Sequence, residues 1–109
     1  MLGATLDTAE YLERLKTEID QLEQAAIQRW SDLVYKAWEN EKFVFVFGNG
    51  GSGTNATHFS EDLGKSSLRP DDLMDESKKR LKIMSLTDNL GWIMAVGNDV
   101  GYDQIFQQQ

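Results

Sequence analysis

The segment that most constrains this chain is an apolar run that leads directly into a glycine-rich turn. Residues 43–47 read Phe-Val-Phe-Val-Phe, and residues 48–53 read Gly-Asn-Gly-Gly-Ser-Gly. A helix-like stretch follows over residues 54–65. A continuous run of β-branched and aromatic residues is typical of a strand that is buried on both faces in a parallel sheet. The order of strand, glycine turn and helix therefore predicts an α/β fold.

The glycine turn also predicts the binding of a phosphorylated small molecule. Glycines permit positive φ angles and leave room for a ligand, and the start of a helix offers free N–H donors. Asn49 and Ser52 can donate hydrogen bonds to phosphate or sugar oxygens, and Ser52 stands where a helix N-cap is expected. The turn lacks the spacing of a dinucleotide-binding motif and the lysine of a P-loop. A tight strand-to-helix turn that binds no ligand is the alternative.

Composition narrows the class of protein. The chain has 109 residues, a net charge of −7 and no cysteine. The negative charge argues against nonspecific binding to nucleic acid or to an acidic membrane. Without cysteine there is neither a disulfide framework nor a thiolate metal site. The sequence contains no signal-peptide pattern and no apolar run near the length of a membrane span, so we expect a cytoplasmic protein.

Two regions are predicted, a helical segment over residues 1–40 and an α/β region over residues 41–109. Asp7 and Glu10 have the spacing of a capping box that begins a helix. An apolar stripe with helical spacing follows, and it consists of Leu12, Leu15, Ile19, Leu22 and Ala26. This stripe faces either the core or another subunit. A second helix is expected over about residues 25–40, although one long bent helix fits the pattern as well.

The α/β region contains a second predicted strand over residues 81–86. A short helix is expected after Thr87–Asn89, and a turn at residues 97–102 follows it. Because sheets average about five to six strands, two strands predict only the first half of a doubly wound parallel sheet. Asn98 and Asp99 are then expected to lie beside the glycine turn, since ligands bind at the carboxyl ends of parallel strands. Alternatively, this turn is merely a helix C-terminal cap formed by Gly97. The three tryptophans are expected in the core.

His58 and Asp62 are spaced to share one face of the helix that follows the glycine turn. Together they could hold a divalent metal or perform acid–base catalysis. A plain surface contact is the alternative, since two ligands are too few for a tight zinc site. Glu61 points about 100° away from Asp62 around the helix and is expected to be solvated.

The segments GNGGSGTNATHFSEDL at 48–63 and SLTDN with VGNDVGYDQIF from residue 85 onward resemble the sugar isomerase (SIS) domain family, and within it the phosphoheptose isomerases. The resemblance implies a parallel α/β sandwich, a homotetramer and isomerisation of sedoheptulose 7-phosphate. It assigns substrate contacts to Asn49, Gly50, Gly51, Ser52, Asn98 and Asp99. His58 matches a zinc ligand. Asp62 stands where the family has a glutamate that acts as metal ligand or base, so both residues become candidates for catalysis and for metal binding.

The same resemblance predicts that this chain corresponds to the N-terminal portion of the family's domain. The loop that grips the phosphate and the remaining metal ligands would belong to the other half, so we expect the chain alone to be inactive. Two alternatives remain. One is a phosphosugar-binding or regulatory SIS protein without catalysis, and the other is an oligomeric interaction module.

Overall fold

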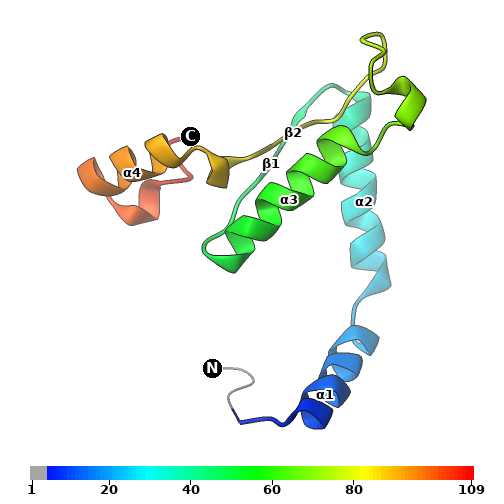
Figure 1. Cartoon of the computed structure of the whole chain (residues 1–109), viewed down its shortest axis with the longest axis vertical. Helices are drawn as coiled ribbons and strands as arrows, with labels where there is room; N and C mark the ends of the chain where they lie inside the picture. Colours follow the sequence, from blue (N-terminus) through cyan, green and yellow to red (C-terminus); the bar gives the residue numbers. More distant parts are fainter. Residues whose placement is uncertain (1–4) are drawn as a thin grey trace. The chain divides into compact units, whose positions relative to one another are not determined.

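The computed structural model describes residues 5–109 and confirms the α/β class (Figure 1). Short 3-10 turns cover Pro70–Asp72, Leu86–Asp88 and Tyr102–Gln104. The longer elements are α1 (Thr8–Asp20), α2 (Gln24–Glu39), β1 (Phe43–Val46), α3 (Gly51–Lys65), β2 (Lys82–Ser85) and α4 (Leu90–Asp99). None of the helices within residues 5–109 is long and apolar enough to cross a membrane. The chain divides into two compact units, the first ending at Asp32 and the second covering Leu33–Gln109. The boundary at residue 40 stays a prediction.

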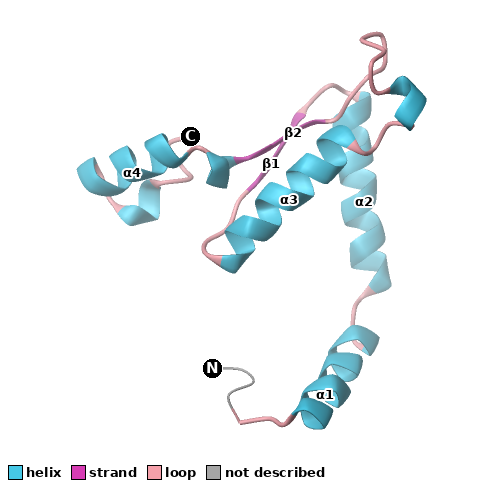
Figure 2. Cartoon of the chain, in the orientation of Figure 1, coloured by secondary structure: helices cyan, strands magenta, loops and turns pink. Residues whose placement is uncertain are grey.

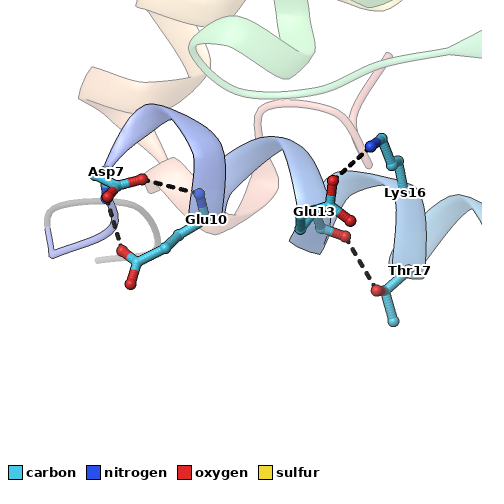
Figure 3. A network of polar contacts seen from close by, with 5 residues as sticks. All are labelled: Asp7, Glu10, Glu13, Lys16 and Thr17. Carbon is cyan, nitrogen blue, oxygen red and sulfur yellow. Dashed lines mark hydrogen bonds and ion pairs between the residues drawn. The ribbon is translucent and has the colours of Figure 1, made fainter.

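Helix α1 begins with the predicted capping box (Figure 3). The Asp7 carboxylate accepts a hydrogen bond from the Glu10 backbone N–H at 2.9 Å, and the Glu10 carboxylate accepts one from the Asp7 N–H at 2.9 Å. These reciprocal bonds satisfy N–H groups that have no partner within the helix. The helix ends at Asp20, and α2 begins only at Gln24. The predicted stripe is therefore wrong beyond Ile19, because Leu22 and Ala26 lie outside α1.

The two strands pair in parallel, as the sequence predicts (Figure 2). Phe43 is opposite Lys82, and Val46 is opposite Ser85. Helix α3, which connects the two strands, packs mainly against β2. It can approach the sheet closely because its buried positions are Gly53, Ala56 and Ser60, all small residues at helical spacing. The carboxyl ends of both strands thus come together beside the start of α3.

Burial of β1 on both faces is not found. Val44 and Val46 are half-buried, whereas Phe43 and Phe45 are 56% and 53% exposed. The rings of these two phenylalanines stack on each other, with centroids 5.6 Å apart. The alternation arises because a strand turns successive side chains to opposite faces, and α3 covers only one of them.

The prediction that the tryptophans are core residues is also wrong. Trp30 and Trp92 are 48% and 43% exposed. Trp38 is half-buried, and its indole N–H donates to the Lys79 carbonyl at 3.2 Å. The Lys79 ammonium lies 5.0 Å from the centroid of the same ring and donates to the Glu39 carbonyl. Trp38 therefore connects the end of α2 with the segment before β2 through its contacts with Lys79.

Candidate functional site

The glycine loop, residues 48–53, turns the chain from β1 directly into α3. Gly50 is the helix N-cap, with φ 55° and ψ −127°, a conformation that L-residues with side chains rarely adopt. The backbone N–H of Ser52 donates to the Asn49 carbonyl at 3.1 Å, and that of Thr54 donates to the Gly50 carbonyl at 3.1 Å. The prediction that Ser52 is the N-cap is therefore wrong. Ser52 lies within the first turn of α3. Helix α3 therefore starts closer to the end of β1 than the sequence predicts.

Thr87 fixes the backbone of this loop from the end of the second strand. Its hydroxyl accepts a hydrogen bond from the Gly48 N–H at 3.3 Å and donates to the Gly48 carbonyl at 3.2 Å. The Thr87 N–H in turn donates to the hydroxyl of Ser85, which is buried at 3% exposure. Since these bonds lie just beyond the paired residues Val46 and Ser85, Thr87 extends the contact between the strand ends into the loop.

The close approach of loop and helix requires glycine at position 53. A Cβ atom added there would lie 2.7 Å from the Gly48 carbonyl oxygen and 2.7 Å from the Thr87 methyl carbon. Real Cβ atoms essentially never come so close to other heavy atoms. A side chain at residue 53 would therefore push Thr87 or Gly48 away.

The second predicted turn reaches the glycine loop through Tyr102. The Tyr102 hydroxyl donates to the Asn49 side-chain carbonyl oxygen at 3.0 Å, across 53 residues of sequence. Asn98 and Asp99 lie in the last turn of α4, and the Asn98 side-chain amide donates to the Asp99 carboxylate at 2.8 Å. Gly97 is inside the helix and Val100 is the C-cap, so the alternative cap by Gly97 is wrong. The substrate contacts assigned to these residues remain predictions.

His58 and Asp62 form the predicted pair on α3. The His58 Nε2 atom lies 3.3 Å from an Asp62 carboxylate oxygen, and the two side chains are 76% and 56% exposed. One imidazole nitrogen and one carboxylate oxygen are donors of the kind that zinc binds, but a structural zinc site takes four ligands. Within residues 5–109, no group of three or more His, Cys, Asp or Glu side chains could hold a metal. The pair alone therefore does not constitute a metal centre.

Glu61 belongs to a different face of α3, as predicted. Its carboxylate accepts a hydrogen bond from the Lys65 ammonium at 2.9 Å. That hydrogen bond, together with the positive charge of Lys65, holds the pKa of Glu61 below its usual value. The negative charge of Glu61 is thus matched locally by Lys65.

Sequence reasoning did not single out three residues that build this region, namely Thr57, Thr87 and Tyr102. The Thr57 hydroxyl donates to the Asp88 carboxylate and so joins α3 to the segment after β2. Thr57 and Asp88 border an open groove of about 390 Å³, which is also lined by Ser60, Glu61 and Ser85. The available signal was the position of Thr87 and Asp88 directly after a predicted strand, where parallel sheets place their polar site residues.

Comparison with known proteins now identifies the class. The SIS domain family matches residues 9–109, and the chain belongs to this family. It is 38% identical over 93 residues to the phosphoheptose isomerase of Buchnera aphidicola subsp. Acyrthosiphon pisum (strain Tuc7), an alignment that covers 85% of this chain and 42% of that protein.

Two further phosphoheptose isomerases are similar to this chain. The phosphoheptose isomerase of Buchnera aphidicola subsp. Schizaphis graminum is 36% identical over 107 residues, covering 98% of this chain and 48% of the relative. That of Helicobacter pylori (strain ATCC 700392 / 26695) is 31% identical over 98 residues, covering 89% and 46%. The chain spans about half the length of the curated relatives it matches.

Proposed function

We propose that this chain is the sugar-binding part of a phosphoheptose isomerase, which interconverts sedoheptulose 7-phosphate and an aldose phosphate. The observation that carries the proposal is the glycine loop, held by Thr87 and Tyr102 at the carboxyl end of β1. Gly50 and the start of α3 present N–H groups and the positive end of a helix dipole there. The names of the relatives supply the substrate class.

In the proposed reaction, a base removes the proton from the carbon next to the sugar carbonyl. The electron pair left behind forms an enediolate. A proton then passes from the hydroxyl oxygen to the former carbonyl oxygen, and return of a proton to the former carbonyl carbon completes the exchange of ketose for aldose. Asp62 would be the base or a metal ligand, and His58, 3.3 Å away, would be the acid or a metal ligand. Asn49 and Ser52 would hold the sugar, and their donors would stabilise negative charge on the enediolate oxygens.

We also propose that His58 and Asp62 contribute two ligands to a zinc ion. Zinc would supply a positive charge at the developing oxyanion. The donor types fit this role, but the remaining ligands would have to come from outside the set described here.

Binding of sedoheptulose 7-phosphate to the 109-residue chain tests the proposal first. We expect the melting temperature to rise with ligand concentration, because a ligand that binds only the folded chain stabilises it by RT ln(1 + [L]/Kd). Sedoheptulose without phosphate and inorganic phosphate alone are the controls. A melting temperature that does not respond to the sugar phosphate at millimolar concentration would overturn the proposal. Since the chain spans about half of its relatives, we expect binding without turnover.

A non-catalytic phosphosugar-binding role is the second candidate, and the exposure of the His58–Asp62 pair favours it. Both side chains are more than half exposed, whereas a catalytic base works best where water is excluded. Joining residues 1–109 to the unmatched part of the Buchnera isomerase separates the two roles. Turnover by this chimera supports the isomerase. Binding without turnover, with turnover restored by Asp62→Glu, supports the binding protein.

We further propose that the chain assembles in the cytoplasm into a homo-oligomer, which is a tetramer in the full-length family. Leu12, Leu15 and Ile19 on α1 are 43–55% exposed, which supports a subunit contact at this face. The combined substitution Leu15→Asp and Ile19→Asp should lower the mass measured by light scattering, with Thr17→Asp as the control. An unchanged mass would exclude this face. If the chain forms oligomers and no phosphosugar changes their melting temperature, the chain is instead an interaction module.

A further inference from the structure

Tyr102 sits on a segment that is anchored at the carboxyl ends of both strands. Ile105 is buried, with 3% exposure, and the Phe106 ring packs against Phe47 with centroids 4.8 Å apart. The Gln109 side chain donates to the Leu86 carbonyl at 3.1 Å, just after β2. These contacts determine where the Tyr102 ring lies relative to the glycine loop, independently of the Tyr102 hydroxyl itself.

The hydroxyl contact determines which end of the Asn49 carboxamide faces the ligand. A carboxamide has one acceptor, its oxygen, and two N–H donors on its nitrogen. Tyr102 donates to the Asn49 oxygen at 3.0 Å, so the oxygen is held toward Tyr102 and the NH₂ group is held away from it. We propose that Tyr102 is a positioning residue that turns the Asn49 NH₂ group toward the bound sugar phosphate. This inference rests on the proposed function of the loop.

The consequence is a loop that offers donors to its ligand. The start of α3 brings the positive end of its helix dipole to the loop, and the oriented Asn49 adds two side-chain N–H bonds of the same polarity. Such a surface selects ligand oxygens that accept hydrogen bonds, as phosphate and ketose carbonyl oxygens do, and disfavours an ammonium group. Without Tyr102 the carboxamide can rotate and present its oxygen instead, which reverses the polarity at this position.

The contact is separable from folding. Tyr102 is 64% exposed, and the burial of its segment comes from Ile105 and Phe106. Tyr102→Phe therefore removes the donor while keeping the ring. Tyr11→Phe is the matched control, because Tyr11 is 52% exposed and lies on α1 in the other compact unit.

The test is ¹H–¹⁵N NMR of the full 109-residue chain and of the variants, with sedoheptulose 7-phosphate as the titrant. In Tyr102→Phe we expect the two side-chain NH₂ signals of Asn49 to move and the dissociation constant to rise about three- to tenfold, the effect of one lost hydrogen bond. Tyr11→Phe should change neither. Asn49→Asp keeps an acceptor for Tyr102 but loses the donors, so binding should weaken by more than about tenfold.

The outcomes separate this inference from the function on which it rests. If Asn49 signals in Tyr102→Phe match those of the unchanged chain, Tyr102 does not orient the carboxamide and the inference is wrong. If they move but the sugar phosphate binds with unchanged affinity, the inference is equally wrong while the proposed function stands. If the unchanged chain binds no sugar phosphate, the proposed function fails, and the role of Tyr102 in ligand binding fails with it.

Discussion

The glycine loop and the His58–Asp62 pair lie at the start and in the middle of the same helix, yet they are held in different ways. Gly48 and Asn49 in the loop are fixed by residues 39 and 53 positions further along the chain, Thr87 and Tyr102. His58 and Asp62 contact each other across one helical turn on an exposed face. The loop is therefore shaped by the fold before any ligand arrives, whereas the contact within the pair is made inside α3. Preorganisation is therefore found at Gly48 and Asn49 rather than at His58 and Asp62.

The largest expected effect that tests this difference is that of Gly53→Ala. The added methyl would lie 2.7 Å from both Gly48 and Thr87, so the loop must move, and we expect the free energy of unfolding to fall by about 1–3 kcal/mol. Gly51→Ala is the control, because a Cβ atom there meets nothing within 4 Å, and it should be neutral or slightly stabilising. Urea denaturation measures both. Equal stability of the two variants would show that the loop is not tightly packed.

A smaller effect is expected from Thr87→Val, which keeps the shape of the side chain and removes its hydroxyl. We expect a loss of about 1–2 kcal/mol of unfolding free energy, because the Gly48 N–H and carbonyl both lose a partner. Hydrogen exchange at the Gly48 amide should also be faster in this variant, because the amide has lost its acceptor. Thr87→Ser retains the hydroxyl and should restore the slow exchange. Fast exchange in the serine variant would point to the methyl group instead.

Substitution in the His58–Asp62 pair should, unlike substitution in the glycine loop, have little effect on the free energy of unfolding. His58→Ala removes an exposed contact, so the free energy of unfolding should change by less than about 0.5 kcal/mol. Any stabilisation by added Zn²⁺ should disappear in the same variant, which calorimetry would detect. A large loss of stability without metal would mean that the pair is as strongly built into the fold as the loop.

The smallest effect concerns Glu61, which lies next to the pair and forms an ion pair with Lys65 at 2.9 Å. Because the folded pKa of Glu61 lies below its usual value of about 4.5, the Lys65 contact stabilises the fold above about pH 4.5. This stabilisation is lost as the pH falls through the folded pKa. Glu61→Gln should therefore differ slightly from the unchanged chain at pH 7 and match it near pH 2. Urea midpoints at the two pH values provide the comparison. A larger difference at the acidic pH would contradict the assigned sign.

Local patterns were predictable from the sequence, and long-range contacts were not. The capping box, both strands, the glycine turn and the His58–Asp62 contact depend on residues close together in the chain. The end of α1 at Asp20 was missed because no glycine or proline marks it. A turn was expected to begin at residue 97, with a helix cap by Gly97 as one alternative, but the helix continues to Asp99. The bonds from Thr87 and Tyr102 to the loop depend on how distant segments pack, which periodicity alone does not encode.

The backbone angle at Gly50 has a consequence for the chirality of this position. With φ at 55° and ψ at −127°, the residue adopts the mirror image of a conformation that ordinary L-residues favour. The space beside it is open, since a Cβ atom would meet nothing within 4 Å, so handedness and not crowding is the obstacle. A D-alanine introduced by chemical synthesis would fit this corner, whereas every chiral residue of the genetic code would strain it. The chain is thus committed to glycine at position 50 whether or not a sugar phosphate binds there.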